Sequence, residues 1–344
     1  METRSSLSIL VHLPNWIGDT VMALPSLEAL GRIAGWQVTL LGRTDPLSLT
    51  LGVPGIPARW SLPRRGTVLN AVPWFLRMAR NLRENTFDAA VTFSPSFSSG
   101  ALLAASGARH RIGWHGQGRG LLLNRLWVRR RRGKVHLTRE YGELVRAVGA
   151  PAGEGPPRIH WLEGEREAGR AALEPLGSRP AVALIPGAHY GPTKRWPLDR
   201  YLELARRLLA CRYGVVWIGG PEERGVLTDK MKEPLDPVYS LDLMGSLELR
   251  SSAAVLSHCR AAVANDSGGM HVADAAGCPT LGLFGSTDPR WTGPGAASRT
   301  ARHPVDCSPC FRASCPYGLE CWTGLSTPAV WDALIDLLDG SGGA

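Results

Sequence analysis

Hydrophobic residues in the first half of the chain alternate between short continuous runs and longer segments with helical spacing. Residues 6–13 (SLSILVHL) form an apolar run of the kind that predicts a buried strand. The turn PNWIG separates this run from a segment with apolar residues at helical intervals, and residues 36–43 form the next apolar run. Further strands are expected at 87–93 and within 107–114, with a helix of small residues near 98–106 between them. Strands that alternate with helices predict βαβ units and a parallel sheet.

The same alternation restarts after residue 180. Apolar runs that predict strands lie within 180–188, 213–219, 260–265 and 279–285. Amphipathic segments between these runs predict helices at 197–212 and 247–259. The second half of the chain is therefore also expected to form a sheet with covering helices.

The Pro- and Gly-rich stretch at 149–160 separates the two alternating regions. We expect an α/β protein with a first domain over 1–150, a linker region over 151–178 and a second domain over 179–327. A C-terminal helix is expected over 328–344, and packing back toward the first domain is one option for it. Two open parallel sheets of this kind would face each other across a cleft. Ligands of such sheets bind at the carboxyl ends of the strands.

The stretch NDSGGMHVAD (265–274) lies where a predicted strand turns into a predicted helix. Free backbone N–H groups at a helix start attract anions, and Gly268 and Gly269 would let a bulky anion approach the backbone. Ser267 adds a hydroxyl donor, and His271 lies one turn further on the same side. A diphosphate would fit this turn. The alternative is that Asp266 or Ser267 only caps the helix and His271 packs inside.

Two further strand ends carry polar side chains. IPGAHYGPTKRWP (185–197) places Thr193 and Lys194 just before a helix entry at Pro197, and a lysine there is a compact phosphate donor. WIGGPEE places Glu222 and Glu223 after two glycines, where a carboxylate can accept hydrogen bonds from ribose hydroxyls. The alternatives are a surface lysine and solvated loop charges.

The charge of the chain is uneven. Its 344 residues suit two domains, and the net charge is +9. Residues 1–160 hold 21 Lys and Arg against 9 Asp and Glu, so the first half is strongly basic. This predicts a nucleic acid, an anionic membrane or a phosphorylated substrate as partner, unless the charges only solvate the surface. No apolar run reaches the roughly 20 residues of a membrane span, and we expect a cytoplasmic protein without a signal peptide.

Four segments together resemble a known enzyme family. LPNWIGDTVMALPSLEAL, PGAHYGPTKRWP, NDSGGMHVADAAGCPTLGLFGSTDP and CSPCFRASCPYGLEC are similar to the ADP-heptose:lipopolysaccharide heptosyltransferases of glycosyltransferase family nine, in particular the heptosyltransferase II type. The segments occur in family order, whereas residues 55–85 and 110–135 show no family pattern. The resemblance implies a GT-B fold of two Rossmann-like domains, with parallel sheets facing a central cleft. The first domain would bind the acceptor and the second the nucleotide sugar.

The resemblance also implies an activity. It is the inverting, metal-independent transfer of heptose from ADP-L-glycero-D-manno-heptose to the heptosyl-Kdo2 inner core of lipopolysaccharide. Asp19 matches the catalytic base and Lys194 the phosphate-binding lysine, whereas the alternative role of Asp19 is to cap its helix. The matching residues of the donor-site turn are Asp266, Ser267, Gly268 and His271. Either Glu222 or Glu223 should bind the ribose, and the turn of Asn15, Trp16 and Gly18 belongs to the acceptor side.

An acceptor of this kind would account for the basic first half. Inner-core lipopolysaccharide carries Kdo carboxylates, and its lipid A-Kdo2-heptose form is anchored in the cytoplasmic leaflet of the inner membrane. We expect peripheral contact with that leaflet through RRRRGK (129–134) and the amphipathic VPWFLRMARNLR (72–83), with Trp74 and Phe75 inserted. The alternative is a helix whose apolar face covers its own core.

The cysteines leave a question open. An odd count of seven suits a reducing compartment. Cys307, Cys310, Cys315 and Cys321 lie close in sequence and could bind a structural zinc, or conceivably an iron–sulfur cluster, or form a reduced loop. The implied chemistry requires no metal and no cofactor.

Other classes of function remain as alternatives. One is a different GT-B enzyme, such as a heptosyltransferase of type I or III, another nucleotide-sugar transferase or an epimerase. A non-enzymatic nucleic-acid-binding protein is a remote alternative, because the arginine run lacks interleaved aromatics and a recognised RNA or DNA module. We therefore expect no nucleic-acid partner. A dinucleotide-dependent oxidoreductase is disfavoured, since no G-x-G-x-x-G follows the first strand.

Overall fold

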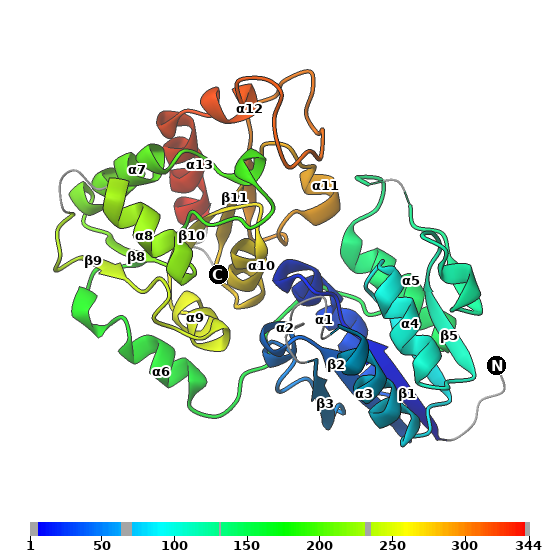
Figure 1. Cartoon of the computed structure of the whole chain (residues 1–344). Helices are drawn as coiled ribbons and strands as arrows, with labels where there is room; N and C mark the ends of the chain where they lie inside the picture. The colour runs from blue at the N-terminus through cyan, green and yellow to red at the C-terminus, as the bar shows by residue number, and fades with distance from the viewer. Residues whose placement is uncertain (1–5, 63–70, 131, 231–234, 341–344) are drawn as a thin grey trace. The chain divides into compact units, whose positions relative to one another are not determined.

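The computed structural model describes residues 6–62, 71–130, 132–230 and 235–340. The chain divides into two compact units, Met1–His160 and Trp161–Ala344, which we call unit 1 and unit 2 (Figure 1). Each unit is an α/β domain with its own sheet and core. In the described part of the chain, no helix has the length and apolar character needed to cross a membrane.

Unit 1 alternates strands with helices from its first described residues onward. Its strands are β1 Leu7–His12, β2 Trp36–Gly42, β3 Ala58–Ser61, β4 Ala89–Thr92, β5 His110–Trp114 and β6 Arg125–Trp127. Its helices are α1 Ile17–Gly31, α2 Thr44–Ser48, α3 Ala71–Arg83, α4 Phe97–Ala105, the 3-10 turn η2 Arg119–Leu121 and α5 Leu137–Val148. The strands pair in parallel in the order β3-β2-β1-β4-β5-β6.

Unit 2 repeats the same design. Its strands are β7 Ala181–Ile185, β8 Gly214–Trp217, β9 Ser240–Asp242, β10 Ala261–Asn265, β11 Thr280–Leu283 and β12 Arg299–Ala301. Its helices are α6 Glu165–Ala171, η3 Glu174–Leu176, η4 Pro192–Lys194, α7 Leu198–Ala210, α8 Pro221–Lys230, α9 Leu249–Leu256, α10 Gly268–Ala275, α11 Pro289–Thr292, α12 Glu320–Thr323 and α13 Thr327–Gly340. All strand pairs are parallel, and the order is β12-β11-β10-β7-β8-β9.

Both sheets have the strand order of a Rossmann domain, with the first and fourth strands of the unit adjacent at the centre. The chain leaves these two strands in opposite directions, which opens a crevice at their carboxyl ends. In unit 1 the switch lies between β1 and β4, and in unit 2 between β7 and β10. The predicted site residues Asp19, Lys194 and Asp266 lie in the segments that follow β1, β7 and β10, with Asp266 directly after its strand.

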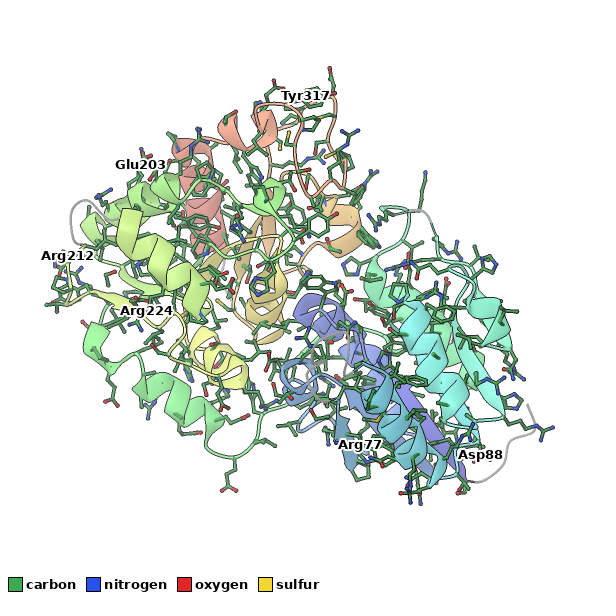
Figure 2. The ribbon with its side chains drawn as sticks, in the orientation of Figure 1. Arg77, Asp88, Glu203, Arg212, Arg224 and Tyr317 are labelled. Atoms are coloured by element: carbon green, nitrogen blue, oxygen red, sulfur yellow. The ribbon has the colours of Figure 1, made fainter. Side chains whose placement is uncertain are left out.

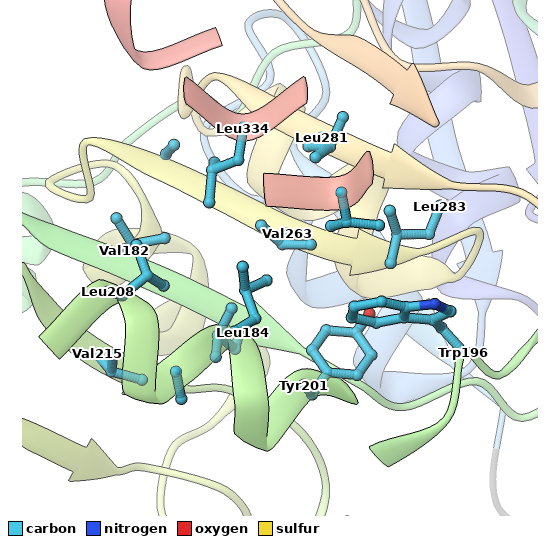
Figure 3. Packing of buried hydrophobic residues seen from close by; sticks show 14 of the residues in the cluster. Val182, Leu184, Trp196, Tyr201, Leu208, Val215, Val263, Leu281, Leu283 and Leu334 are labelled. Atoms are coloured by element: carbon cyan, nitrogen blue, oxygen red, sulfur yellow. The ribbon is translucent and has the colours of Figure 1, made fainter. Parts of the chain in front are cut away.

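The core of unit 2 is built from the apolar faces of its strands and covering helices (Figure 3). Trp196 and Tyr201, at the entry of α7, are buried and meet edge to face with ring centroids 5.0 Å apart. Leu334 of α13 belongs to the same cluster, and α13 contacts α7 as well as β10, β11 and β12. The C-terminal helix therefore packs on the sheet of unit 2, whereas the sequence had left open that it packs toward the first domain.

The segment expected as a linker contains folded structure. Helix α6 packs against α9, and Gly169 lies so close that an added Cβ would be 2.4 Å from the backbone of Ala254. Glu165 and Arg250 join the two helices by a bidentate ion pair, with Arg250 Nε 2.6 Å from Glu165 Oε1. The division into units falls between residues 160 and 161, so α6 belongs to unit 2.

The surface helix α3 of unit 1 uses its apolar face mainly for its own domain. Met78 and Leu82 are buried in the core of unit 1, and Phe75 packs against that core. Phe75 is thus half-buried against its own core, and the side chain of Trp74 lies outside the described residues. Arg77 stands on the outer surface of the helix, where Figure 2 labels it.

Candidate functional site

The loops after β7 and β10 are joined by one buried asparagine. Asn265, the last residue of β10, is fully buried, and its Oδ1 accepts hydrogen bonds from Trp196 N at 3.0 Å and Tyr201 Oη at 3.2 Å. Its Nδ2 donates to the carbonyl of Pro186 at 2.6 Å. One amide side chain therefore holds the segment around Lys194 against the start of the Asp266 turn.

Lys194 and Asp266 form an ion pair at this point. Lys194 Nζ lies 2.7 Å from Asp266 Oδ2, and the lysine side chain is 17% exposed whereas the aspartate is 3% exposed. Asp266 also accepts hydrogen bonds from Thr287 Oγ1 at 2.5 Å and Thr292 Oγ1 at 3.4 Å. The carboxylate of Asp266 thus faces the interior of unit 2 and pairs there with the ammonium of Lys194. An ammonium carries three N–H donors, so Lys194 retains donors for an anion at the surface.

The helix start expected after Asp266 is present. Ser267 is the N-cap of α10, and its side chain makes no capping hydrogen bond. Residues 267–269 are partly exposed between buried neighbours, and they directly follow Asp266, the partner of Lys194. Amides in the first turn have no carbonyl partner within their helix, and the helix dipole favours negative charge there. Unlike Ser267, His271 is buried, at 6% exposure.

Gly269 and Thr193, two residues of the predicted donor site, make packing or hydrogen-bond contacts within unit 2. A Cβ on Gly269 would lie 2.6 Å from Ile185 Cγ2, so this glycine lets α10 pack closely on β7. Thr193 is 1% exposed, and its hydroxyl donates to the carbonyl of Arg312 at 2.5 Å. The Thr193 hydroxyl is thus engaged with the cysteine-rich loop and does not point to a ligand.

The two glutamates after β8 differ in position. Glu223 is half-buried, its Oε2 accepts a hydrogen bond from Gly220 N at 2.8 Å, and its side chain lies over Gly187 at the end of β7. Glu222 is exposed. Glu223 therefore lies against the start of the loop that leads from β7 to Lys194. The next residue of α8, Arg224, pairs with Asp242 of β9 at 3.0 Å.

In unit 1, Asp19 lies in the first turn of α1. The helix begins at Ile17 with Trp16 as its N-cap, so the alternative role of Asp19 as the N-cap is wrong. A carboxylate in the first turn is favoured by the helix dipole. Asp19 is half-buried, Gly18 is buried, and Asn15 and Trp16 are exposed.

The surroundings of Asp19 include a buried tyrosine. Burial raises the pKa of Tyr141 well above its ordinary value, and the charge of Asp19 raises the pKa of Tyr141 further, which places the two groups near each other. Tyr141 packs against Phe93, with ring centroids 5.0 Å apart. The loop after β4, at the switch point of the sheet, carries serine hydroxyls. Ser96 is the N-cap of α4, and its side chain accepts a hydrogen bond from Ser99 N at 3.2 Å.

The four clustered cysteines form a loop that is fastened to the donor half of the site. Phe311 N donates to Ser286 O at 2.8 Å, and Ser308 Oγ donates to Gly285 O at 2.6 Å. Burial, followed by the nearby thiol groups of Cys307, Cys315 and Cys310, raises the pKa of Cys321. Across the described ranges, no three His, Cys, Asp or Glu side chains are arranged to hold a metal ion. The structural zinc suggested by the spacing is therefore unsupported.

Comparison with known proteins identifies the family. The model described as glycosyltransferase family 9 (heptosyltransferase) matches residues 75–320. The chain belongs to glycosyltransferase family 9. It is thus a glycosyltransferase, and the family resemblance drawn from the motifs is confirmed. The open choice between an enzyme and a nucleic-acid-binding protein is decided for the enzyme.

Relatives of this family 9 chain match nearly its whole length. The lipopolysaccharide heptosyltransferase 2 of Escherichia coli strain K12 is 29% identical over 308 residues, which cover 84% of this chain and 85% of the relative. The lipooligosaccharide heptosyltransferase 2 of Haemophilus influenzae is 27% identical over 313 residues, which cover 84% and 86%.

A solved structure supports the fold of this family 9 chain. The ADP-heptose lipopolysaccharide heptosyltransferase II of E. coli superposes with a TM-score of 0.80 at 25% identity, over 96% of this chain and 98% of that one. The family 9 glycosyl transferase of Veillonella parvula has the same fold, with a TM-score of 0.83 at 20% identity and 98% of each chain covered. The predicted class, α/β with two Rossmann-like domains of the GT-B type, is confirmed.

Three residues important for the site were missed from the sequence. Asn265 was quoted only as part of a motif, and Thr287 and Thr292 were not singled out. Their partners lie 21 to 79 residues away in the chain, so spacing along the sequence gives no sign of the contact. The one available signal for Thr287 is its place at the end of the predicted strand at 279–285.

Proposed function

We propose that this family 9 enzyme transfers heptose from ADP-L-glycero-D-manno-heptose to the heptosyl-Kdo2 inner core of lipopolysaccharide, with lipid A-Kdo2-heptose as acceptor. The observation that carries the proposal is the Lys194–Asp266 pair beside the first amides of α10, in a chain similar over 84% of its length to lipopolysaccharide heptosyltransferase 2. An ammonium and free amides at a switch point form a site for the diphosphate of a nucleotide sugar.

The donor diphosphate is assigned to Lys194 and the turn at 267–269. Two remaining N–H donors of Lys194 and the first amides of α10 would bind phosphate oxygens, and they would stabilise the charge that develops on departing ADP. Asp266 does not contact the phosphates in this scheme, because its carboxylate faces the interior. It holds Lys194 in place, so it is a positioning residue. Of the two glutamates, Glu223 is proposed to accept the ribose hydroxyls.

The transfer step is an in-line displacement with inversion. The acceptor hydroxyl oxygen bonds to the anomeric carbon of heptose while the bond from that carbon to the phosphate oxygen breaks, and ADP leaves with the electron pair. The acceptor proton passes to the carboxylate of Asp19, which acts as general base. Every charge that changes is met by a side chain or amide of the protein, so the step needs no metal ion and no cofactor.

The acceptor accounts for the charge of unit 1. This unit holds 21 basic against 9 acidic residues, and inner-core lipopolysaccharide is anionic. Because the acceptor is anchored by lipid A, the enzyme would work in the cytoplasm at the inner face of the inner membrane.

An assay with ADP-heptose and mono-heptosylated Kdo2-lipid tests the proposal. The product should gain the mass of one heptose, and Lys194→Ala should bind ADP about 10- to 100-fold more weakly, since a charged hydrogen bond contributes roughly 1.5–3 kcal/mol. Lys134→Ala, which removes an exposed lysine of unit 1, is the control for donor affinity. Heptosylation only of Kdo2-lipid without its first heptose, or stabilisation by UDP rather than ADP, would contradict the proposed substrates.

A further inference from the structure

Three consecutive leucines in unit 1 have very different environments. Leu123 is 3% exposed and belongs to the core of unit 1, whereas Leu121 is 91% exposed at the end of the 3-10 turn η2. A leucine exposed to this extent contributes almost nothing to the packing of its own domain. Its apolar surface is open to a partner.

The exposed leucine is held on a firm support. Arg119, 3% exposed, donates from Nε to Gly116 O at 2.9 Å and from Nη2 to His115 O at 3.0 Å. Backbone bonds from Leu122 N and Leu123 N to Arg119 O, at 2.9 and 2.8 Å, close the turn. The protrusion of Leu121 is therefore built into a hydrogen-bonded turn that is anchored by Leu123.

The neighbouring edge strand adds more exposed apolar surface. Leu126 of β6 and Val128, the residue just after the end of β6, are 37% and 76% exposed. A Cβ on Gly120 would lie 3.6 Å from Leu126 Cδ1, which places η2 directly against β6. We call Leu121, Leu126 and Val128 the apolar rim.

Basic side chains follow the rim immediately. Arg129 pairs with Glu140 at 2.8 Å and Arg130 with Glu143 at 3.2 Å, while Arg132 and Lys134 are exposed. Arg130, Arg132 and Lys134 thus present positive charge at the surface. Exposed aliphatic side chains bordered by cations are the combination that binds an anionic bilayer surface.

We propose that the apolar rim enters the headgroup region of an anionic lipid bilayer, with the exposed Arg130, Arg132 and Lys134 on the phosphates. The inference deepens the proposed function, because it rests on an acceptor that is anchored in lipid. A lipid surface fits better than a folded protein partner, since a stable protein interface buries about 800 Å² per partner and the rim comprises three side chains. The rim is also a better candidate for the membrane contact than α3, because the apolar face of α3 packs mainly on the core of unit 1.

Vesicle flotation with the full chain tests the rim. Vesicles of phosphatidylcholine with phosphatidylglycerol should carry the protein at low salt, and vesicles of phosphatidylcholine alone should carry far less. The double variant Leu121→Asp/Val128→Asp should bind anionic vesicles about 10-fold or more weakly. Two apolar contacts with the bilayer are lost, and the two added negative charges are repelled by the anionic lipid. Because both side chains are exposed, the thermal unfolding of this double variant should match that of the parent.

Matched controls lie on unit 2 and on α3. Leu162→Asp/Val238→Asp places the same changes at side chains that are 44% and 55% exposed, and Leu76→Asp changes a 62% exposed residue of α3. Both controls should float like the parent. Equal flotation of the rim variant and the parent, loss of flotation only in Leu76→Asp, or an absence of flotation with anionic vesicles would each overturn the proposal.

A second acceptor separates this inference from the proposed function. With a heptosyl-Kdo2 oligosaccharide that lacks acyl chains, the rim variant should turn over at the parental rate, while its rate on vesicle-embedded acceptor should fall. Failure of the parent to heptosylate either acceptor would defeat the proposed function whatever the flotation result. Equal rates of parent and rim variant on embedded acceptor would defeat the role of the rim alone.

Discussion

Lys194 Nζ and Thr287 Oγ1 meet at the same atom, Asp266 Oδ2, at 2.7 and 2.5 Å. The threonine lies after β11 and the lysine after β7, so a buried carboxylate of the β10 turn joins three strand ends. Such a contact orients the ammonium without using the donors that face outward. If Lys194 binds the donor as proposed, donor binding should depend on the Thr287 hydroxyl through Asp266.

Thr287→Val should weaken donor binding through Lys194. Valine has the shape of threonine but cannot donate to Asp266, so the aspartate turns and the ammonium shifts. We expect the KM for ADP-heptose to rise about 5- to 10-fold, less than for direct loss of a hydrogen bond between Lys194 and the donor, because Thr287 acts only through Asp266. Thr287→Ser should restore the parental KM, a result that a purely structural role of the methyl group would not produce. Steady-state kinetics with varied donor measure both.

Asp19→Asn should abolish proton transfer while the donor still binds. The amide preserves the shape of the side chain but cannot accept the acceptor proton, and general bases contribute about 10²- to 10⁴-fold to rate. We expect kcat to fall in that range with ADP affinity unchanged by calorimetry. Asp45→Asn, which alters an exposed aspartate in the first turn of α2, is the matched control. Parental turnover by Asp19→Asn would remove Asp19 from the mechanism.

Glu223→Gln should lower the affinity for ADP, whereas Glu222→Gln should not. Only Glu223 lies against the end of β7, so only it can reach a ribose held beside Lys194. The expected loss is about 10-fold for ADP, and it should largely vanish for an ADP analogue without ribose hydroxyls. Titration of both ligands into both variants measures this. An equal loss with the analogue would show that Glu223 does not bind the ribose.

The Glu165–Arg250 pair should make unit 2 sensitive to acid. The hydrogen bond and charge of Arg250 hold the pKa of Glu165 below its ordinary value, against the opposing effect of burial. A depressed carboxyl pKa contributes stability above the unfolded-state pKa, and this contribution is lost as the pH falls through the folded-state pKa. Glu165→Gln should therefore cost about 2 kcal/mol near neutral pH, less than the 3–5 kcal/mol of a fully buried pair.

The pH dependence separates this effect from a simple loss of packing. The difference between parent and Glu165→Gln should shrink once the pH falls below the ordinary glutamate range, near 4.5. Glu167→Gln changes an exposed neighbour on α6 and should unfold like the parent at every pH. Thermal unfolding between neutral and acidic pH measures all three proteins. A difference that does not change with pH would show that the charge of Glu165 is not involved.

The central strands and the main helices could be predicted because each carries its own pattern. β1, β2, β4, β7, β8, β10 and β11 coincide with apolar runs, and α1, α4, α7, α9 and α10 with helical spacing or a clear helix start. The edge strands β3, β6, β9 and β12 were not predicted. Each has three or four residues with at most partial burial, so the hydrogen bonds of one neighbouring strand define it, not a pattern of its own.

For the candidate site, too, local features could be predicted from the sequence and contacts between distant residues could not. The types and positions of Asp19, Lys194 and the 265–271 turn could be read from the sequence, because polar residues at the carboxyl ends of strands are a local signal. The choice of Glu223 over Glu222, the inward direction of Asp266 and the use of Thr193 to hold the cysteine loop could not. These depend on which strand ends become neighbours.

By itself the sequence determined that this is an α/β glycosyltransferase with polar groups at four strand ends, since periodicity and motifs are properties of contiguous residues. The tertiary structure alone decided which of those groups touch, which are exposed and which serve the core. Contacts such as that of Thr287 with Asp266 join residues 21 positions apart, and their geometry follows from the order of strands in the sheet. Leu121 and Leu123 show the same division, because identical side chains two residues apart were assigned to solvent and core only by the fold.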